Sequence, residues 1–215
     1  SGKFKTTLEA KFEAQKLAFA PISFHATKTM RDLGILQTIH DAGRTGISVA
    51  NIAEELQISE YGISTLLEVG LGIDLVEMSC DKYTLTKTGS LILLDEMTRV
   101  NMDFVGDLCY QGAAFLSESI LTSKPAGLKV FGDWKTVYQG LSSLPTKAKN
   151  SWFAFDHYYS DDAFADALPI VFKNQPKNLF DIGGNTGKWA ISCLNYDSSV
   201  QITILDLPTQ LQIAR

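Results

Sequence analysis

The spacing of apolar residues predicts that the first part of the chain folds as consecutive helices. Apolar side chains recur at helical spacing in residues 8–20 and in Thr27–Ala42, and the second of these helices is expected to end at Gly43. Two further apolar runs follow Ser48 and Ser59. A serine directly before such a run is a favoured N-cap, because its hydroxyl accepts a hydrogen bond from a backbone N–H group of the first turn.

Two short β-prone runs come next. Leu75–Met78 and Tyr83–Thr86 flank a polar turn at Ser79–Lys82, a pattern that predicts a β-hairpin. Helices followed by a hairpin in this order make the plan of a winged helix. We therefore expect residues 1–95 to form a mainly α, winged-helix-like domain.

Residues 96–173 are predicted to form a helical connector that lines a pocket. Asp161 and Asp162 are expected to cap one of its helices, and Pro169 to bend that helix or to end it early. Amphipathic spacing in and just before this part predicts helices over Leu91–Met97, Met102–Ile120 and Trp134–Leu141.

Residues 174–215 have the pattern of a parallel βαβ unit. Leu179–Ile182 is a short apolar strand, a glycine-rich turn and a helical run follow it, and Val200–Leu205 is β-prone. Two parallel strands cannot bury the faces that such a sheet normally covers. We therefore expect the chain to be part of a longer protein, with this domain incomplete at Arg215.

The turn after the first of these strands has features of a nucleoside-binding loop. It reads DIGGNTG over residues 181–187, and its glycines let a ligand approach the main chain without meeting a Cβ atom. Asp206 stands 19 residues after Gly187, at the end of the second strand. An acidic side chain at that position accepts hydrogen bonds from ribose hydroxyls.

Two common phosphate-binding patterns do not fit this turn. The dinucleotide pattern GxGxxG would need glycine at Asn185 and at Lys188. The phosphate loop GxxxxGK[ST] would need glycine at Ile182, and serine or threonine at Trp189. S-adenosylmethionine carries no phosphate, so its site needs no anion cradle. The turn therefore favours this sulfonium nucleoside as the cofactor.

Two segments around the turn also resemble a known family. LFDIGGNTGKWA and ITILDLP are similar to the cofactor motifs of S-adenosylmethionine-dependent O-methyltransferases that carry an N-terminal winged-helix dimerisation domain. Plant caffeate and flavonoid enzymes and bacterial natural-product enzymes belong to this family. LGILQTIHDAGRTGISVANIAEELQISEYGISTLLEVGLGIDLVE and YTLTKTGSLIL resemble its dimerisation domain, and FDHYYSDDAFADAL stands where it has the helix before the cofactor motif. The resemblance implies a mainly α dimerisation domain followed by the start of an α/β Rossmann-like methyltransferase domain.

The same resemblance implies roles for residues of the turn. Asp181 would orient the turn, Asp206 would hold the ribose, and Leu207 would pack on the adenine. Asn185 departs from the glycine that the family usually has, so its side chain is expected to crowd the cofactor. The predicted cofactor-binding residues are Asp181, Gly183, Gly184, Asn185, Gly187, Asp206 and Leu207.

The implied reaction is methyl transfer from the sulfonium to a small-molecule hydroxyl by in-line displacement. The family's general base would lie beyond Arg215, so no catalytic residue and no metal ligand is predicted here. His25 and His40 belong to the dimerisation domain, and a structural role is the better interpretation of His157. The predicted pocket residues are Asp156, His157 and Tyr159.

A winged-helix transcription regulator is the main alternative. Thr45–Cys80, which would hold the recognition helix, contains no Lys or Arg but six acidic residues, and DNA would repel such a surface. We therefore expect a homodimer built largely from residues 1–120, with no nucleic-acid or membrane partner. A family member that has lost catalysis and acts as a binding protein stays open as a third interpretation.

Composition agrees with a soluble globular protein. The 215 residues are 45% hydrophobic and carry a formal net charge of −5, and no apolar run is long enough to span a bilayer. The cysteines Cys80, Cys109 and Cys193 are widely spaced and form no CxxC pair, which favours reduced thiols in a cytoplasmic protein.

Overall fold

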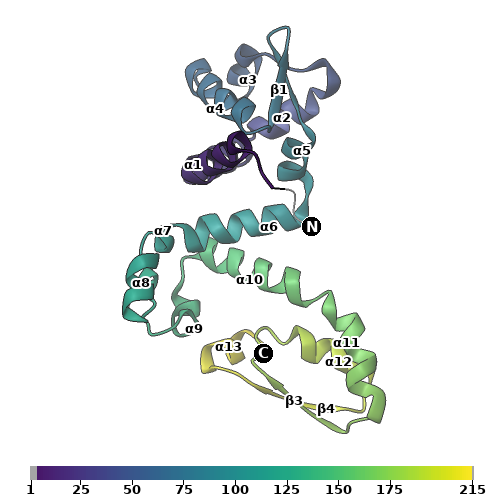
Figure 1. Cartoon of the computed structure of the whole chain (residues 1–215). Helices are drawn as coiled ribbons and strands as arrows, with labels where there is room; N and C mark the ends of the chain where they lie inside the picture. Colours follow the sequence, from purple (N-terminus) through teal and green to yellow (C-terminus); the bar gives the residue numbers. More distant parts are fainter. Residues whose placement is uncertain (1–3, 215) are drawn as a thin grey trace. The chain divides into compact units, whose positions relative to one another are not determined.

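The computed structural model describes residues 4–214, the side chains of residues 209 and 213 apart (Figure 1). The chain folds into two units, Ser1–Met102 and Asp103–Arg215. Each unit has its own buried apolar cluster, and the glycine turn belongs to the second unit.

The first unit begins with one long helix, α1 (Thr7–Asp32), where we predicted two. Thr6 and Glu9 form a capping box at its start, and Pro21 lies inside the helix without ending it. The chain turns instead at Gly34, which adopts a left-handed φ of 85°, and α2 (Ile35–Asp41) follows. The prediction of a continuous helix over Thr27–Ala42 was therefore wrong, because it overlooked the glycine that allows this turn.

The two serine N-caps are confirmed. Ser48 accepts a hydrogen bond from the Asn51 N–H group at 3.3 Å and starts α3 (Val49–Leu56). Ser59 accepts one from the Gly62 N–H group at 3.2 Å and starts α4 (Glu60–Gly72). A short 3₁₀ turn, Gly43–Thr45, connects α2 to this pair of helices.

The predicted hairpin is confirmed as β1 (Val76–Ser79) and β2 (Lys82–Leu85), paired in antiparallel register. Its turn is tighter than the predicted one, because only Cys80 and Asp81 lie outside the strands. Both have positive φ, 50° and 58°, as a two-residue hairpin turn of the primed type requires. Tyr83 also pairs with Ile47, which ties the hairpin to the segment before α3.

The core of the first unit lies between α1, α2, α3, α4 and the hairpin. Its side chains are almost completely withdrawn from solvent, and burial of each large one contributes roughly 1.5–3 kcal/mol. The fully buried members are Met30, Ile35, Leu36, Ile39, Ile52, Ile63 and Leu67. The helix α5 (Lys87–Leu94) packs against the same core through Ile92 and Leu93.

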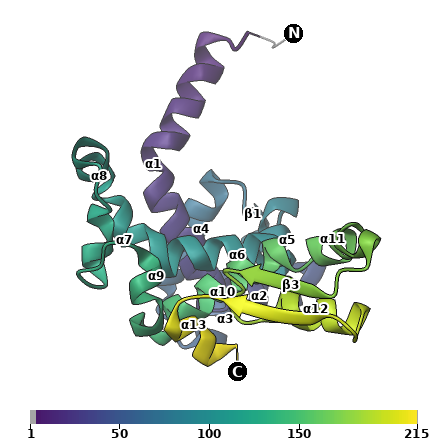
Figure 2. The ribbon, with the colours of Figure 1, turned by 90° about the horizontal axis from the view of Figure 1, so that it is seen from below.

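The N-terminal part of α1 leaves this core. Figure 2 shows it extending beyond α2, α3 and α4. Large apolar side chains on this part are exposed to solvent, with Leu8 and Leu17 at 77% and Phe12, Phe19 and Ile22 near 60%. An isolated helix does not bury such residues by itself, so this surface is suited to contact with another apolar surface.

The helices at the end of the first unit and in the first part of the second unit are shorter than predicted. Leu91–Met97 is interrupted at Asp95, which has an extended backbone and accepts a hydrogen bond from the Thr98 N–H group. Met102–Ile120 is divided by a π-helical stretch and by a break at Phe115. The helices of this part are α6 (Glu96–Phe104), α7 (Tyr110–Ala113), α8 (Leu116–Thr122), α9 (Val137–Gly140), α10 (Thr146–Ser160) and α11 (Ala163–Val171).

Two further expectations need correction, namely the capping of α11 and the extent of the helix predicted over Trp134–Leu141. Asp162 precedes α11 but makes no capping hydrogen bond, and Asp161 binds side chains on other elements instead. Pro169 lies inside α11, which ends two residues later at Val171. Of the predicted helix Trp134–Leu141, only Val137–Gly140 is α-helical.

The predicted βαβ unit is confirmed. β3 (Asn178–Ile182) and β4 (Gln201–Leu205) pair in parallel, with α12 (Lys188–Tyr196) between them in the chain and α13 (Pro208–Ile213) after them (Figure 1). Leu179 and Ile202 pack on buried Cys193, Phe172 and Val200. The opposite face of the two strands presents the exposed side chains of Phe180, Ile182 and Leu205.

Among the described residues, no helix combines the length and apolar character needed to cross a membrane. The same residues contain no group of three or more His, Cys, Asp or Glu side chains that could hold a metal ion.

The turn at Gly46 gives a test of the first unit. Gly46 has φ 65° and ψ 169°, and a Cβ atom there would lie 3.0 Å from the Tyr83 carbonyl oxygen. Gly46→Ala should lower the free energy of unfolding by about 2 kcal/mol, because L-residues avoid this backbone region. Urea denaturation measures the change.

The matched control is Gly72→Ala. Gly72 ends α4, and a Cβ atom there would meet nothing within 4 Å. This variant should be as stable as the wild type or slightly more so, because alanine favours the helix. Equal loss of stability in both variants would contradict the role of Gly46.

Candidate functional site

The glycine turn passes from β3 to α12 through three residues of left-handed backbone. Gly183, Asn185 and Gly187 have φ of 77°, 50° and 80°. Asparagine tolerates this conformation better than other non-glycine residues, so the turn accepts Asn185 where the resemblance led us to expect glycine. The Gly183 N–H group donates to the Leu205 carbonyl oxygen at 2.8 Å, which fixes the turn beside the end of β4.

Asp206, directly after β4, holds the turn from the other side. One of its carboxylate oxygens accepts the Asn185 backbone N–H group at 2.7 Å, and the other accepts the Leu207 N–H group at 2.6 Å. A carboxylate has about four acceptor positions, so each oxygen can accept one more hydrogen bond. Asp206 thus shapes the turn and still offers two acceptor positions to a ligand.

Asp181, near the end of β3, lies beneath the turn. A Cβ atom on Gly184 would stand 2.6 Å from its Oδ2 atom, so only glycine fits there. This Oδ2 atom is buried and has no hydrogen-bond partner within the described part of the chain. Burial raises the pKa of the Asp181 carboxyl group above its ordinary value, and the negative charge of Asp206 raises it further.

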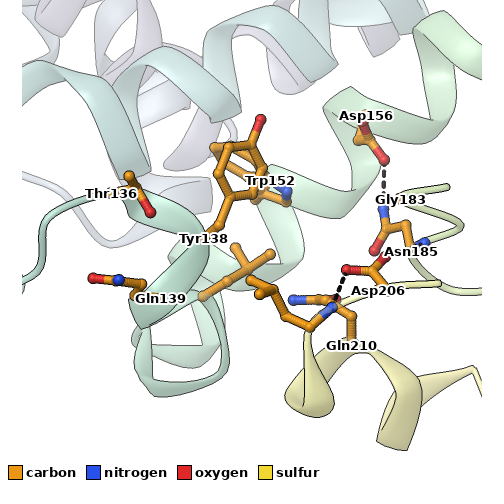
Figure 3. Close-up of a pocket in the computed structure, with 11 residues that line it drawn as sticks. Thr136, Tyr138, Gln139, Trp152, Asp156, Gly183, Asn185, Asp206 and Gln210 are labelled. Atoms are coloured by element: carbon orange, nitrogen blue, oxygen red, sulfur yellow. Dashed lines mark hydrogen bonds between the residues drawn. The ribbon is translucent and has the colours of Figure 1, made fainter.

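The helix α10 contacts the turn through two neighbouring side chains. The Asn185 Nδ2 atom donates to the Asp156 Oδ2 atom at 2.6 Å (Figure 3). His157 places its Nε2 atom 3.2 Å from the Thr186 hydroxyl. These contacts connect both side chains of the Asn185-Thr186 pair to α10, 29 residues earlier in the chain.

His157 is in turn held by Asp161. The His157 Nδ1 atom lies 3.1 Å from Asp161 Oδ1, and the Lys188 ammonium group donates to Asp161 Oδ2 at 2.7 Å. Partial burial would raise the pKa of Asp161, but hydrogen bonds and charges from Lys188 and His157 outweigh it, so the pKa is lowered. Sequence reasoning missed this contact, since it assigned Asp161 to a helix cap.

A cavity of about 570 Å³ opens beside the turn. Asp156, Asn185 and Asp206 form its polar side, and Gly183 exposes its main chain to it. Figure 3 shows Trp152 and Tyr138 across the cavity from Asp206. The lining residues are Thr136, Tyr138, Gln139, Leu141, Trp152, Asp156, Gly183, Asn185, Asp206, Leu207 and Gln210.

The structure brings most of the predicted site residues to this region. Asp156 lines the cavity, while His157 lines a smaller one of about 190 Å³ together with Asp181 and Gly184. Tyr159 lines neither cavity. It packs on Phe155 at a centroid distance of 4.9 Å and is 51% exposed, so a role in a pocket stays a prediction.

Several cavity residues were not predicted. Thr136, Tyr138, Gln139 and Leu141 come from α9 and its flanking residues, and Trp152 from α10. No motif in the sequence marks them, because their position depends on how the helices of the second unit pack. Gln210 lies on α13, four residues after Asp206. This spacing was the one signal that could have identified Gln210 as a cavity residue.

The model of the Dimerisation2-like domain matches residues 11–83, within the first unit. No curated protein matches the chain by sequence.

Solved structures share the fold of the chain. The S-adenosylmethionine-dependent methyltransferase SibL is 22% identical, with a TM-score of 0.64 over 93% of this chain and 59% of its own. The mitomycin 7-O-methyltransferase MmcR is 15% identical, with a TM-score of 0.70 over 95% and 60%. Human N-acetylserotonin methyltransferase, solved with SAM, is 18% identical, with a TM-score of 0.66 over 100% and 64%.

The chain has the fold of these methyltransferases. It spans about three-fifths of the length of those structures. The match to N-acetylserotonin methyltransferase covers the whole of this chain, and so includes the glycine turn and the strand ends around the cavity.

The two perturbed carboxyl groups give opposite predictions for stability. Because the pKa of Asp181 is raised, the folded protein favours the protonated carboxyl group over the ionised one. The fold therefore loses stability as the pH rises above about 4 and this group ionises. Asp181→Asn should therefore be more stable than the wild type at neutral pH. The difference should shrink toward pH 3, as measured by urea denaturation across this range.

Asp161→Asn is the matched comparison. Because the pKa of Asp161 is lowered, its ionised carboxylate stabilises the fold. This contribution to the free energy of unfolding is lost as the pH falls below about 4. The variant should be less stable than the wild type at neutral pH and should approach it in acid. The same sign of change in both variants would contradict the described environments.

Proposed function

We propose that the chain is the front part of an S-adenosylmethionine-dependent O-methyltransferase that acts on a small molecule. One observation carries the proposal: the Asp206 carboxylate and the open main chain of Gly183 line the same cavity. The shared fold with methyltransferases and the pattern of the glycine turn support it.

The residues around the cavity fit this cofactor. A Cβ atom at Gly183 would meet nothing within 4 Å, so the main chain there is open to a ligand. Asp206 retains an acceptor position on each oxygen, which suits the two hydroxyls of a ribose. The volume of about 570 Å³ lies within the range of small-molecule sites.

Each residue then has a distinct part in binding. Asp206 accepts the ribose hydroxyls, and Leu207 offers an apolar surface to the base. Asp181 supports the turn from beneath through its contact with Gly184. The Asn185 side chain does not rotate freely into the cavity, because its amide group donates a hydrogen bond to Asp156. This bond removes part of the crowding that the sequence led us to expect.

The cofactor, when bound, supplies a methyl group that its sulfonium makes electrophilic. The acceptor hydroxyl oxygen would form a bond to this carbon while the carbon–sulfur bond breaks, leaving S-adenosylhomocysteine. The hydroxyl proton would pass to a general base, which we place beyond residue 215. The cavity residues of this chain would bind and orient the nucleoside, and Leu141 and Trp152 would give it apolar surface.

We also propose the roles of the three parts of the chain. Residues 1–95 would form a winged-helix-like dimerisation domain, residues 96–173 a pocket-lining connector, and residues 174–215 the first βαβ unit of a Rossmann-like domain. The match of residues 11–83 to the Dimerisation2-like domain supports the first role. A cytoplasmic location fits the free thiols of Cys80, Cys109 and Cys193.

A homodimer accounts for the exposed apolar side chains in the N-terminal part of α1. Leu8, Phe12, Leu17, Phe19 and Ile22 are each at least 59% exposed within one chain. A second copy of this surface would cover them. DNA binding is the weaker interpretation, because residues 45–80 contain no Lys or Arg to meet phosphates.

Asp206→Ala tests the cofactor site. The substitution removes the ribose acceptor and the bond to the Asn185 N–H group, so affinity for S-adenosylhomocysteine should fall at least about 30-fold. Isothermal titration calorimetry on the whole protein measures this change. Asp166→Ala, on the exposed side of α11, is the control and should bind as the wild type does.

Two results would count against the proposal. Absence of S-adenosylmethionine and S-adenosylhomocysteine binding by the wild type would overturn the cofactor assignment. Binding without methyl transfer to any hydroxyl compound, in a broad screen with labelled methyl groups, would favour a binding protein that has lost catalysis.

The homodimer gives a separate prediction. Light scattering on the whole protein at micromolar concentration should give twice the chain mass. Phe12→Glu with Leu17→Glu should shift the protein toward monomer, because charges in the exposed N-terminal part of α1 oppose its burial. A wild-type monomer would contradict the proposed role of residues 1–120.

A further inference from the structure

Gln210 is a polar side chain buried without a partner at the edge of the cavity. It lies on α13 and is only 4% exposed. Both of its backbone polar groups are hydrogen-bonded: the N–H group donates to the Leu207 carbonyl, and the carbonyl accepts from the Ala214 N–H group. Its side-chain Oε1 and Nε2 atoms have no hydrogen-bond partner among the described residues.

Burial of a carboxamide without hydrogen-bond partners costs free energy unless a bound molecule supplies them. A carboxamide that leaves water loses its hydrogen bonds, and nearly all buried polar groups in proteins recover them elsewhere. Gln210 lines the same cavity as Asp206, and Figure 3 shows the two side chains next to each other at its edge. These two unpaired polar atoms beside the cavity point to a hydrogen-bonding partner that enters it.

The surroundings of Gln210 suit a flat aromatic base. Asp206 stands four residues before Gln210, ahead of α13, and presents acceptors for a ribose. Leu207, Leu141 and Trp152 supply apolar surface within the same cavity. A nucleoside whose ribose binds Asp206 would carry its base toward this apolar part, where Gln210 is the buried amide.

We propose that Gln210 recognises the adenine base of the cofactor. Its Oε1 atom would accept a hydrogen bond from the 6-amino group, and its Nε2 atom would donate one to the adjacent ring nitrogen. A carboxamide pairs with adenine in this two-bond manner when proteins read nucleic acids. This inference rests on the proposed function, since it assigns the base of the same nucleoside that Asp206 holds.

The test compares two ligands and two variants of the whole protein. The ligands are S-adenosylhomocysteine and its analogue in which hydrogen replaces the 6-amino group. The wild type should bind the analogue roughly tenfold more weakly, because one hydrogen bond is lost and Oε1 stays unpaired. Gln210→Leu should bind both ligands with equal, weaker affinity.

The stability of the free protein separates recognition from a structural role. Gln210→Leu removes a buried amide without a partner, so its melting temperature should equal or exceed that of the wild type. Gln210→Glu keeps an acceptor for the 6-amino group and loses the donor to the ring nitrogen. This variant should bind both ligands more weakly than the wild type but should keep a preference for S-adenosylhomocysteine.

Gln212→Leu is the matched control, because Gln212 lies on α13 and is exposed. It should leave both affinities unchanged. If Gln210→Leu melts at a lower temperature or fails to fold, or if its ligand preference equals that of the wild type, Gln210 does not read the base. If the wild type binds neither ligand, the proposed function itself fails.

Discussion

The hydrogen bond between the Asn185 backbone N–H group and the Asp206 carboxylate is the interaction on which the site depends. It joins the glycine turn after β3 to the end of β4, two points 21 residues apart in the chain. Parallel strands place their carboxyl ends at one edge of a sheet, and this bond fixes the distance between the two loops that leave it. The same carboxylate is the one proposed to hold the ribose, so the loop geometry and the ligand acceptor are set by one side chain.

The helix α10 adds a second set of contacts to this frame. Asp156 holds the Asn185 side chain, and His157 contacts Thr186 while it is itself held by Asp161. A left-handed residue such as Asn185 is strained unless its surroundings support it. The turn therefore has support from β4 through its backbone and from α10 through its side chains, which favours a site that is formed before a ligand arrives.

The sequence predicted local structure better than packing. Ser48, Ser59, the hairpin and the βαβ unit follow from neighbouring residues, and the structure confirms them. The helix boundaries at Gly34 and Asp95 were missed, because apolar periodicity continued through both positions. Trp152 and Gln210 could not be assigned to the cavity, since contacts among distant helices determine which side chains reach it. The packing of Tyr159 on its aromatic neighbours Phe155 and Tyr158 was likewise not readable from the sequence.

A crystal structure of the whole protein with S-adenosylhomocysteine would test the central claim most directly. The account predicts that both ribose hydroxyls lie within hydrogen-bond distance of the Asp206 carboxylate, with the nucleoside against the main chain of Gly183. The bond from the Asn185 N–H group to Asp206 should persist in that complex. A nucleoside bound elsewhere, or one whose ribose leaves Asp206 unpaired, would contradict the account.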